Sequence, residues 1–437
     1  MSTASRHLGV WSGAGIVIAN MIGSGVFVSA GFMAQDMGPG PLLLAWVVGG
    51  ALALAGTLAY ATASRLVPRS GGEYRYLSDL MHPALGYLAG WATLLLGFSA
   101  PIAINAVAAA SFAGTLLPLP SVQGVAAASI LAMTLVHALD LDLSRRTQNG
   151  LVVVKLALVV GFVLLGLVAG SSAWPGWAPP RPTSGFPLAA FATSLFYIAY
   201  AFSGWNAAIY VAEEFHDPGR DVPRSMAAGC ALVAALYLLV NWIFVANLTP
   251  ERAAAVLHYE QSRVTLGHLV TQDLIGPRGA AVMSAFAVVT FLSTMSAMTF
   301  AGPRVCAAMA EDGFLPRVLA GRTGRPPAAS VALQGALALA LLYTHRLQET
   351  LQNVGAILTL FSALTAFSLF WVRFRRPELR RPSAASLAAA GLYVVSAGWM
   401  LYFGLQGHTH LVGWLLAVVA FTLLAYVVTR PRRGPVL

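Results

Sequence analysis

The chain has 437 residues, of which 58% are hydrophobic and only 10% are charged, and its mean hydropathy is +0.73. These values exclude a soluble globular protein and indicate a polytopic membrane protein. The formal net charge of +10 would suit a nucleic-acid partner, but the basic residues lie mostly in short loops between apolar stretches. Cys230 and Cys306 both lie in apolar stretches, so the sequence predicts neither a disulfide framework nor a metal site, and no cofactor.

Apolar stretches long enough to cross a bilayer alternate with charged or Pro/Gly-rich breaks along the whole chain. Twelve spans are predicted, at roughly 9–33, 41–64, 83–117, 122–139, 149–171, 187–213, 226–247, 279–305, 328–344, 351–372, 384–404 and 410–429. The connections are short, so we expect a single all-α integral membrane domain over residues 1–437, without a cleavable signal peptide.

Arginines concentrate in alternate loops, at a ratio of about four to one, and this bias marks the cytoplasmic side of a membrane protein. The sequence therefore predicts a multi-pass protein of a bacterial-type plasma (inner) membrane with both termini in the cytoplasm. The positive charge is then explained by topology, and no nucleic-acid partner is expected.

The first span contains an unusual stretch, Asn20–Phe27, with the sequence NMIGSGVF. Glycine is a poor helix former, and Gly-Ser pairs are places where helices bend or open. An opened helix at membrane depth leaves unpaired N–H and C=O groups, which an amino acid zwitterion could satisfy. The restarted half-helix would offer amides to a carboxylate, and the freed carbonyls would accept from an ammonium. The alternative is that Gly23 and Gly25 only let a neighbouring helix pack closely.

The sixth span has a second interruption of the same kind, within Tyr197–Asn206 (YIAYAFSGWN). It lies five spans after the first, so the two interrupted spans run in opposite directions. Two interrupted helices that open two five-span halves are the signature of an inverted-repeat transporter. We expect a first repeat over 9–171, a second over 187–372, and two extra helices over 384–429.

Lys155 is the only lysine of the chain and lies inside the apolar fifth span. An ionisable group in a span is a functional hypothesis by default, because its burial is costly. One interpretation is a proton carrier, since lysine changes its pKa readily. Another is a permanent cation that pairs with carbonyls at the span-one break, such as that of Ala19, in place of a sodium ion. The third is snorkelling, in which the long side chain reaches the cytoplasmic headgroups.

Other polar residues carry less weight. Asn105 and Ser111 in the third span, and Ser293, Thr294 and Ser296 in the eighth, are candidates for lining a central cavity, and the last three for the cation site of Lys155. Hydroxyls that bond back to their own helix are equally common. Glu213 and Glu214 end the sixth span near Arg220 and Arg224, either as solvated charges or as a cytoplasmic gate.

Four segments together resemble the amino acid–polyamine–organocation superfamily over essentially the whole chain. They are NMIGSGVF, PRSGGEYRYL at Pro68–Leu77, the run YAFSGWN with VAEE and PGRDVPRSM after it, and AGPRVCAAMAEDGFLP at 301–316. Gly204-Trp205-Asn206 and Lys155 most resemble the L-type amino acid transporter branch and its bacterial relatives.

The resemblance implies a LeuT-like fold, a five-plus-five inverted repeat with discontinuous helices 1 and 6 and two extra C-terminal helices. It implies that the substrate carboxylate meets amides near Ser24 and that its ammonium meets carbonyls near Met21 and Ala201. Tyr200 stands where the family has an aromatic lid. The substrate-binding residues expected in this way are Asn20, Met21, Ile22, Gly23, Ser24, Gly25, Tyr200, Ala201, Phe202, Ser203, Gly204 and Trp205.

We therefore expect a secondary active transporter of L-amino acids, in the first place neutral ones, that is independent of sodium. It would work by alternating access, as an exchanger or a proton symporter, in a lipid bilayer and with no obligatory protein partner. No acidic residue lies within a span near the site, which disfavours a cationic substrate.

Two alternatives share this fold. One is an exchanger of cationic amino acids or amines, since Asn20 and Ile22 also resemble a bacterial arginine/agmatine exchanger. The other is an amino acid sensor that does not transport. An intramembrane enzyme is not expected, because the spans contain no paired aspartates, HExxH helix or Ser/His arrangement.

Overall fold

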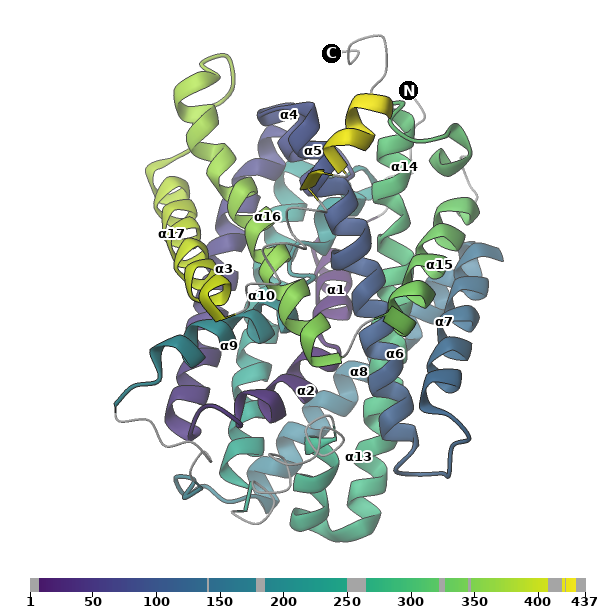
Figure 1. Cartoon of the computed structure of the whole chain (residues 1–437), viewed down its shortest axis with the longest axis vertical. Helices are drawn as coiled ribbons and strands as arrows, with labels where there is room; N and C mark the ends of the chain where they lie inside the picture. The colour runs from purple at the N-terminus through teal and green to yellow at the C-terminus, as the bar shows by residue number, and fades with distance from the viewer. Residues whose placement is uncertain are drawn as a thin grey trace.

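The protein is a bundle of long helices, shown in Figure 1. The computed structural model describes residues 8–139, 141–177, 185–249, 265–321, 327–344, 347–407, 419–420 and 422–429. Within these residues the β-type pairing is one isolated bridge between Leu8 and Phe215, and the rest of the regular structure is helical.

The helices of the first half follow the predicted spans closely. They are α1 (Val10–Met21), α2 (Ser24–Met33), α3 (Pro39–Leu66), α4 (Glu73–Leu80), α5 (Pro83–Ala92), the π-helix η1 (Thr93–Ser99), α6 (Ala100–Ala113), α7 (Val122–Leu139) and α8 (Leu141–Ala169). Helices α5, η1 and α6 are continuous with one another and form the third span.

The helices of the second half begin after residue 185. They are α9 (Leu188–Ala201), the 3-10 helix η2 (Ala207–Glu214), α10 (Pro218–Ala246), α13 (Leu266–Ala301), α14 (Pro303–Glu311), η3 (Arg317–Ala320), α15 (Ala328–Thr344), α16 (Leu347–Arg375) and α17 (Ala384–Gly407).

Nine helical segments of the described residues are long and apolar enough to cross a membrane, and Leu188–Ala201 and Ala328–Tyr343 are shorter apolar helices. Together these segments coincide with the first eleven predicted spans. The twelfth predicted span, 410–429, lies mostly outside the described residues.

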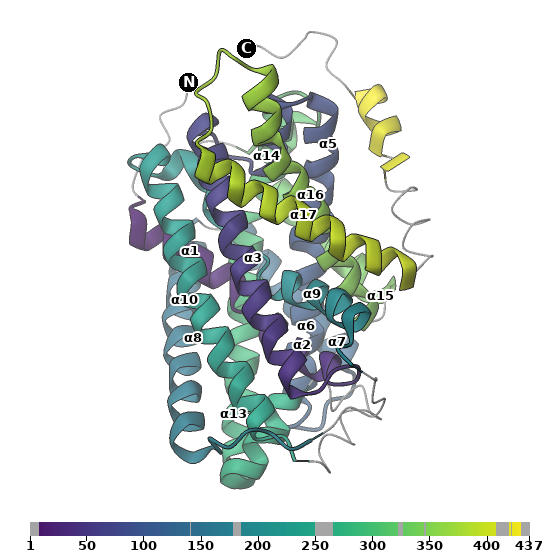
Figure 2. The same ribbon diagram turned by 90° about the vertical axis from the view of Figure 1, so that its left-hand side faces the viewer.

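Large apolar side chains lie exposed on the outside of the bundle. Among them are Leu131, Leu164, Val168 and Val395, each of which is at least half exposed. Exposed apolar surface of this extent marks contact with lipid or with another protein. The outer faces of α7 and α8 and of α17 therefore suit the hydrocarbon of a bilayer. Figure 2 shows α17 lying obliquely across α3 and α9.

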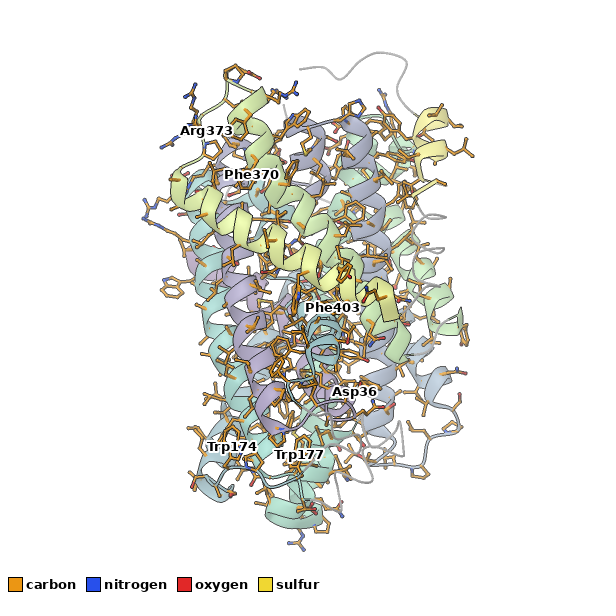
Figure 3. All side chains as sticks on the ribbon, turned by 60° about the vertical axis from the view of Figure 1, so that its left-hand side comes forward. Asp36, Trp174, Trp177, Phe370, Arg373 and Phe403 are labelled. Carbon is orange, nitrogen blue, oxygen red and sulfur yellow. The ribbon has the colours of Figure 1, made fainter. Side chains whose placement is uncertain are left out.

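The loops that were assigned to the cytoplasmic side gather at one end of the bundle. Arg75, at the start of α4, pairs with Asp312 after α14, and Arg376 after α16 donates to the carbonyl oxygen of Asp79 at 3.2 Å. In Figure 3 Arg373 lies toward this end, and Asp36 and Trp174 lie toward the opposite end. The two sets of loops are thus separated as the arginine bias predicts.

Both helix interruptions are present where the glycine-serine pairs predicted them. Helix α1 ends at Met21, Ile22 and Gly23 are extended, and α2 restarts at Ser24. Helix α9 ends at Ala201, and η2 begins only at Ala207. Gly204, between them, has a φ of +100°, which a residue with a side chain rarely adopts.

Candidate functional site

The two interruptions lie against each other at the centre of the bundle. A Cβ atom added at Gly25 would lie 2.4 Å from the Cα atom of Ala201, and one added at Gly204 would lie 2.8 Å from the carbonyl carbon of Asn20. Side chains at these positions would collide with backbone, so both glycines are required by close packing. The packing interpretation of Gly25 is therefore correct as far as this approach of the two breaks goes.

A tyrosine of α10 connects the two breaks. The hydroxyl oxygen of Tyr237 lies 2.6 Å from the carbonyl oxygen of Met21 and 3.0 Å from that of Ala201. These are the carbonyls that the helices leave unpaired when they end, and they are among those expected to accept from a substrate ammonium. In this structure the Tyr237 hydroxyl satisfies them instead.

The first amide of the restarted helix is also satisfied from within the protein. The Ser24 N–H donates to the Asn105 Oδ1 atom of α6 at 2.9 Å, and the Ser24 hydroxyl lies 3.0 Å from the Tyr200 hydroxyl. The Asn105 amide group is held by a hydrogen bond to the Pro101 carbonyl oxygen at 2.8 Å. A side-chain oxygen thus occupies the N-terminus of α2, where a carboxylate would bind. Asn105 belongs to the site, which sequence reasoning considered only as a cavity residue.

Lys155 of α8 points into the span-one break. Its side chain is completely buried, and its Nζ atom lies 2.8 Å from the Ala19 carbonyl oxygen, 2.7 Å from that of Ile22 and 2.8 Å from the Thr294 hydroxyl oxygen. Three acceptors face a group that has three N–H donors when protonated. This geometry is the opposite of snorkelling, because the amine is aimed at the centre of the protein.

Only one of the three hydroxyls of α13 that were expected at this cation site reaches it. The Thr294 hydroxyl lies 2.6 Å from the Ile22 carbonyl oxygen in addition to its contact with Lys155. The Ser296 hydroxyl instead lies 2.8 Å from the His137 ring nitrogen of α7. The Ser293 hydroxyl is buried and has no hydrogen-bond partner among the described residues. The helical period places Ser296, two residues after Thr294, on nearly the opposite face of α13.

The two carboxylates at the end of η2 have different surroundings. Glu214 forms an ion pair with Arg304 of α14, with an N–O distance of 2.7 Å, and does not pair with Arg220 or Arg224. Glu213 is exposed, and its backbone N–H donates to the Ser70 hydroxyl. This ion pair forms because α14, far along the chain, packs against η2.

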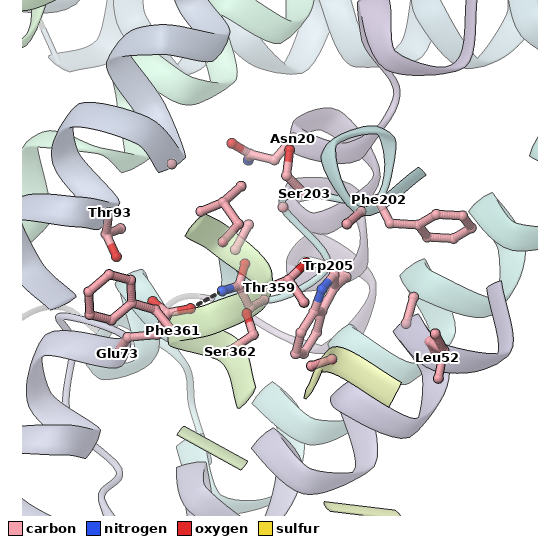
Figure 4. A pocket seen from close by; sticks show the side chains of 18 of the residues that line it. Asn20, Leu52, Glu73, Thr93, Phe202, Ser203, Trp205, Thr359, Phe361 and Ser362 are labelled. Carbon is pink, nitrogen blue, oxygen red and sulfur yellow. Dashed lines mark hydrogen bonds between the residues drawn. The ribbon is translucent and has the colours of Figure 1, made fainter. Parts of the chain in front are cut away.

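A cavity extends from the two breaks toward the end of the bundle where α4 lies. Figure 4 shows the side chains of Asn20, Ser203, Trp205 and Glu73 facing it. Five of the twelve expected substrate-binding residues line it, namely Asn20, Phe202, Ser203, Gly204 and Trp205. Residues 21–25, Tyr200 and Ala201 do not line this cavity, and their polar groups have the partners described above.

Glu73 is the charged residue that sequence reasoning missed. It begins α4, outside the predicted spans, yet only 4% of its surface is exposed and it lines the cavity. Its Oε1 atom accepts from the Tyr60 hydroxyl at 3.1 Å and from the Asn206 side-chain amide, and its Oε2 atom accepts from the Tyr210 hydroxyl. We call these four residues the Glu73 cluster. The statement that no acid lies near the site is true of the spans and wrong for the folded protein.

Comparison of the sequence with known proteins gives matches to amino acid transporters. The family model described as amino acid permease matches residues 8–429. The large neutral amino acids transporter small subunit 2 of Mus musculus is 27% identical over 433 residues, which cover 95% of this chain and 79% of that protein. The b(0,+)-type amino acid transporter 1 of Homo sapiens is 27% identical, over 87% of this chain and 79% of the relative. The Asc-type amino acid transporter 1 of Homo sapiens is 28% identical, over 91% and 77%.

Proposed function

This chain belongs to the amino acid permease family, and from that premise we propose that it is a sodium-independent secondary active transporter of neutral L-amino acids. The observation that carries the proposal is the pair of interrupted helices, which meet beside a cavity and whose backbone groups at the breaks bond to side chains and not within a helix. Backbone amides and carbonyls recognise the two charged groups that all amino acids share, so such a site needs no enzyme chemistry and no cofactor.

The proposed binding step exchanges internal partners for the substrate. A carboxylate would replace Asn105 at the Ser24 amide, and an ammonium would replace the Tyr237 hydroxyl at the Met21 and Ala201 carbonyls. The substrate would then make the hydrogen bonds that Asn105 and Tyr237 make in this structure. The net free energy of binding is the difference between the internally bonded state and the substrate-bound state. A substrate that binds both states equally would drive no conformational change.

The fully buried amine of Lys155 supports independence from sodium. A protonated amine with three acceptors in the span-one break places a fixed positive charge there. The three acceptors match in number the three N–H donors of a protonated amine. We therefore propose Lys155 as a permanent cation of the site.

The proposed architecture is that of the twelve-span inverted repeat, with repeats over 9–171 and 187–372 and two extra helices over 384–429. Grouping of the arginine-rich loops at one end supports a location in a plasma membrane with that end in the cytoplasm. The expected partners are the amino acid and the lipid bilayer.

Uptake into proteoliposomes tests this function. The purified protein would be reconstituted in sodium-free buffer, with and without unlabelled amino acid inside, and offered labelled leucine, methionine, alanine or serine. Uptake that is saturable and unchanged when sodium is added is the expected result. Uptake of labelled arginine or lysine alone would replace the neutral substrates by cationic ones, and saturable binding without uptake would support the sensor.

A further inference from the structure

The Glu73 cluster places a carboxylate in a cavity without a counter-charge. The titratable side chains that face Glu73 are tyrosines, namely Tyr60 of α3, Tyr76 of α4, Tyr210 of η2 and Tyr393 of α17. Within the described part of the chain no lysine, arginine or histidine makes an ion pair with it.

The nearest arginine along the chain is committed elsewhere. Arg75 pairs with Asp312 and lies 3.8 Å from a carboxylate oxygen of Glu311, both at the outer end of the bundle. An ionised carboxylate that is buried without a cation is costly, and a bound proton removes that cost.

Burial raises the pKa of the Glu73 carboxyl from its ordinary value of 4.5, and the hydrogen bonds from Tyr210, Tyr60 and Asn206 oppose that rise. Burial is the larger effect, so the buried carboxyl holds a proton more readily than a free glutamate does. Asn206 follows the span-six break directly, so the cluster is joined to the residues that move when that break rearranges.

A basic side chain of a substrate is a less suitable partner for this carboxylate. Both of its oxygens are already hydrogen-bonded by protein donors, and 4% of its surface is exposed. A guanidinium or ammonium group would have to displace those donors, whereas a proton needs no additional space.

We propose that Glu73 is the proton-binding residue that couples amino acid uptake to a proton gradient. This inference rests on the proposed transport function and assigns the coupling ion to it. One proton binds a Glu73 oxygen from the side with the lower pH, crosses in the same direction as the substrate, and leaves to water on the other side. No bond of the substrate changes.

Proteoliposomes that contain a pH-sensitive dye test the proposal with two readouts. The first is accumulation of a labelled neutral amino acid above equilibrium when the outside is acidic, together with acidification of the lumen. The second is counterflow, in which unlabelled substrate trapped inside drives labelled substrate inward without a pH gradient.

The wild-type protein is expected to show both. Glu73→Gln is expected to lose accumulation and lumen acidification but to keep counterflow, because glutamine resembles the protonated, neutral side chain. Glu378→Gln removes an exposed carboxylate that pairs with Arg376 beside the same end of the bundle, and both readouts should remain.

A second variant keeps the Glu73 carboxyl and changes its pKa. Tyr210→Phe removes the hydrogen bond to Oε2, which favours the ionised carboxylate, so half-maximal proton-driven uptake should move to a higher external pH. A midpoint that stays in place, or moves to a lower pH, would overturn the assignment.

Other outcomes separate this inference from the function on which it rests. Counterflow by the wild type without any response to the pH gradient would overturn the coupling and leave the transporter intact. Proton-driven accumulation that persists in Glu73→Gln would place the coupling proton on another residue. Loss of lysine and arginine uptake in Glu73→Gln, with neutral uptake unaltered, would make Glu73 a recognition group for cationic substrates. Absence of both accumulation and counterflow in the wild type would overturn both proposals.

Discussion

The Nζ atom of Lys155 lies 2.7 Å from the carbonyl oxygen of Ile22, although 133 residues separate them in the chain. Ile22 is the extended residue at which α1 stops, so its carbonyl has no partner in a regular helix. The Lys155 side chain of α8 and the Thr294 hydroxyl of α13 thus supply hydrogen bonds that the broken helix lacks. The contact between Lys155 and Ile22 connects the first interrupted span to the fifth.

Lys155→Ala should abolish transport and leave a folded, membrane-inserted protein. The substitution removes the Lys155 donor from the Ala19 carbonyl, at a cost of about 1–3 kcal/mol for an unsatisfied buried group, and leaves the Ile22 carbonyl with the Thr294 hydroxyl alone. Uptake in proteoliposomes and elution as a monodisperse species in detergent measure the two parts of the prediction. Wild-type uptake by this variant would show that the amine has no part in transport.

Ser24→Pro should abolish substrate binding, because proline has no N–H to offer at the start of α2. Ser24→Ala is the matched control, since it keeps the amide and removes only the hydroxyl contact with Tyr200. Binding of a labelled amino acid to the purified variants distinguishes them. Equal affinity in wild type and Ser24→Pro would remove this amide from the binding site.

Gly25→Ala should impair transport strongly, because the added methyl group would lie 2.4 Å from the Cα atom of Ala201, where only backbone could move. Gly15→Ala, in α1, adds the same methyl group where no atom lies within 4 Å, and it should be tolerated. Thermal midpoints in detergent and uptake rates compare the pair. Similar behaviour of the two variants would contradict the close approach of the breaks.

Stability should depend on pH through Glu73, with a sign that follows from its raised pKa. Between 4.5, its ordinary pKa, and the higher value in the folded protein, the folded state binds more protons than the unfolded state. The stabilisation is therefore full below pH 4.5 and disappears as pH rises through the folded pKa. Glu73→Gln has no carboxyl proton to release. The thermal midpoint of the variant minus that of the wild type should therefore increase as pH rises from 4.5 to the folded pKa, and stay constant above it. A constant difference from pH 4 to 9 would contradict the raised pKa.

The spans and their interruptions could be predicted because they depend on local sequence. Apolar runs of about twenty residues identify spans, and the Gly-Ser pairs at Gly23-Ser24 and Ser203-Gly204 identify the places where the helix opens. The placement of Lys155 was predicted as one of three options, since a lone lysine in an apolar span has few places to go.

The rest of the site depends on which distant segments meet. Glu73 lies in a segment that looks like a solvated loop, and only the packing of α4 against one end of the bundle brings it to the cavity. Glu214 and Arg304 are 90 residues apart, so their ion pair could not be predicted from sequence proximity. Asn105 was visible as a polar residue in a span, but its contact with Ser24 depends on the register between α6 and α2.

The two interrupted helices contact each other on both sides of their breaks. Helix α2 packs against α9 on one side of the breaks, and α1 packs against η2 on the other, where Leu8 also pairs with Phe215. Each half of one helix is therefore coupled to the half of the other that lies on the same side of the membrane. When one side opens, the two halves on that side should move together as one rigid unit, with the extended backbone at Ile22–Gly23 and the turn at Ser203–Gly204 as its hinges.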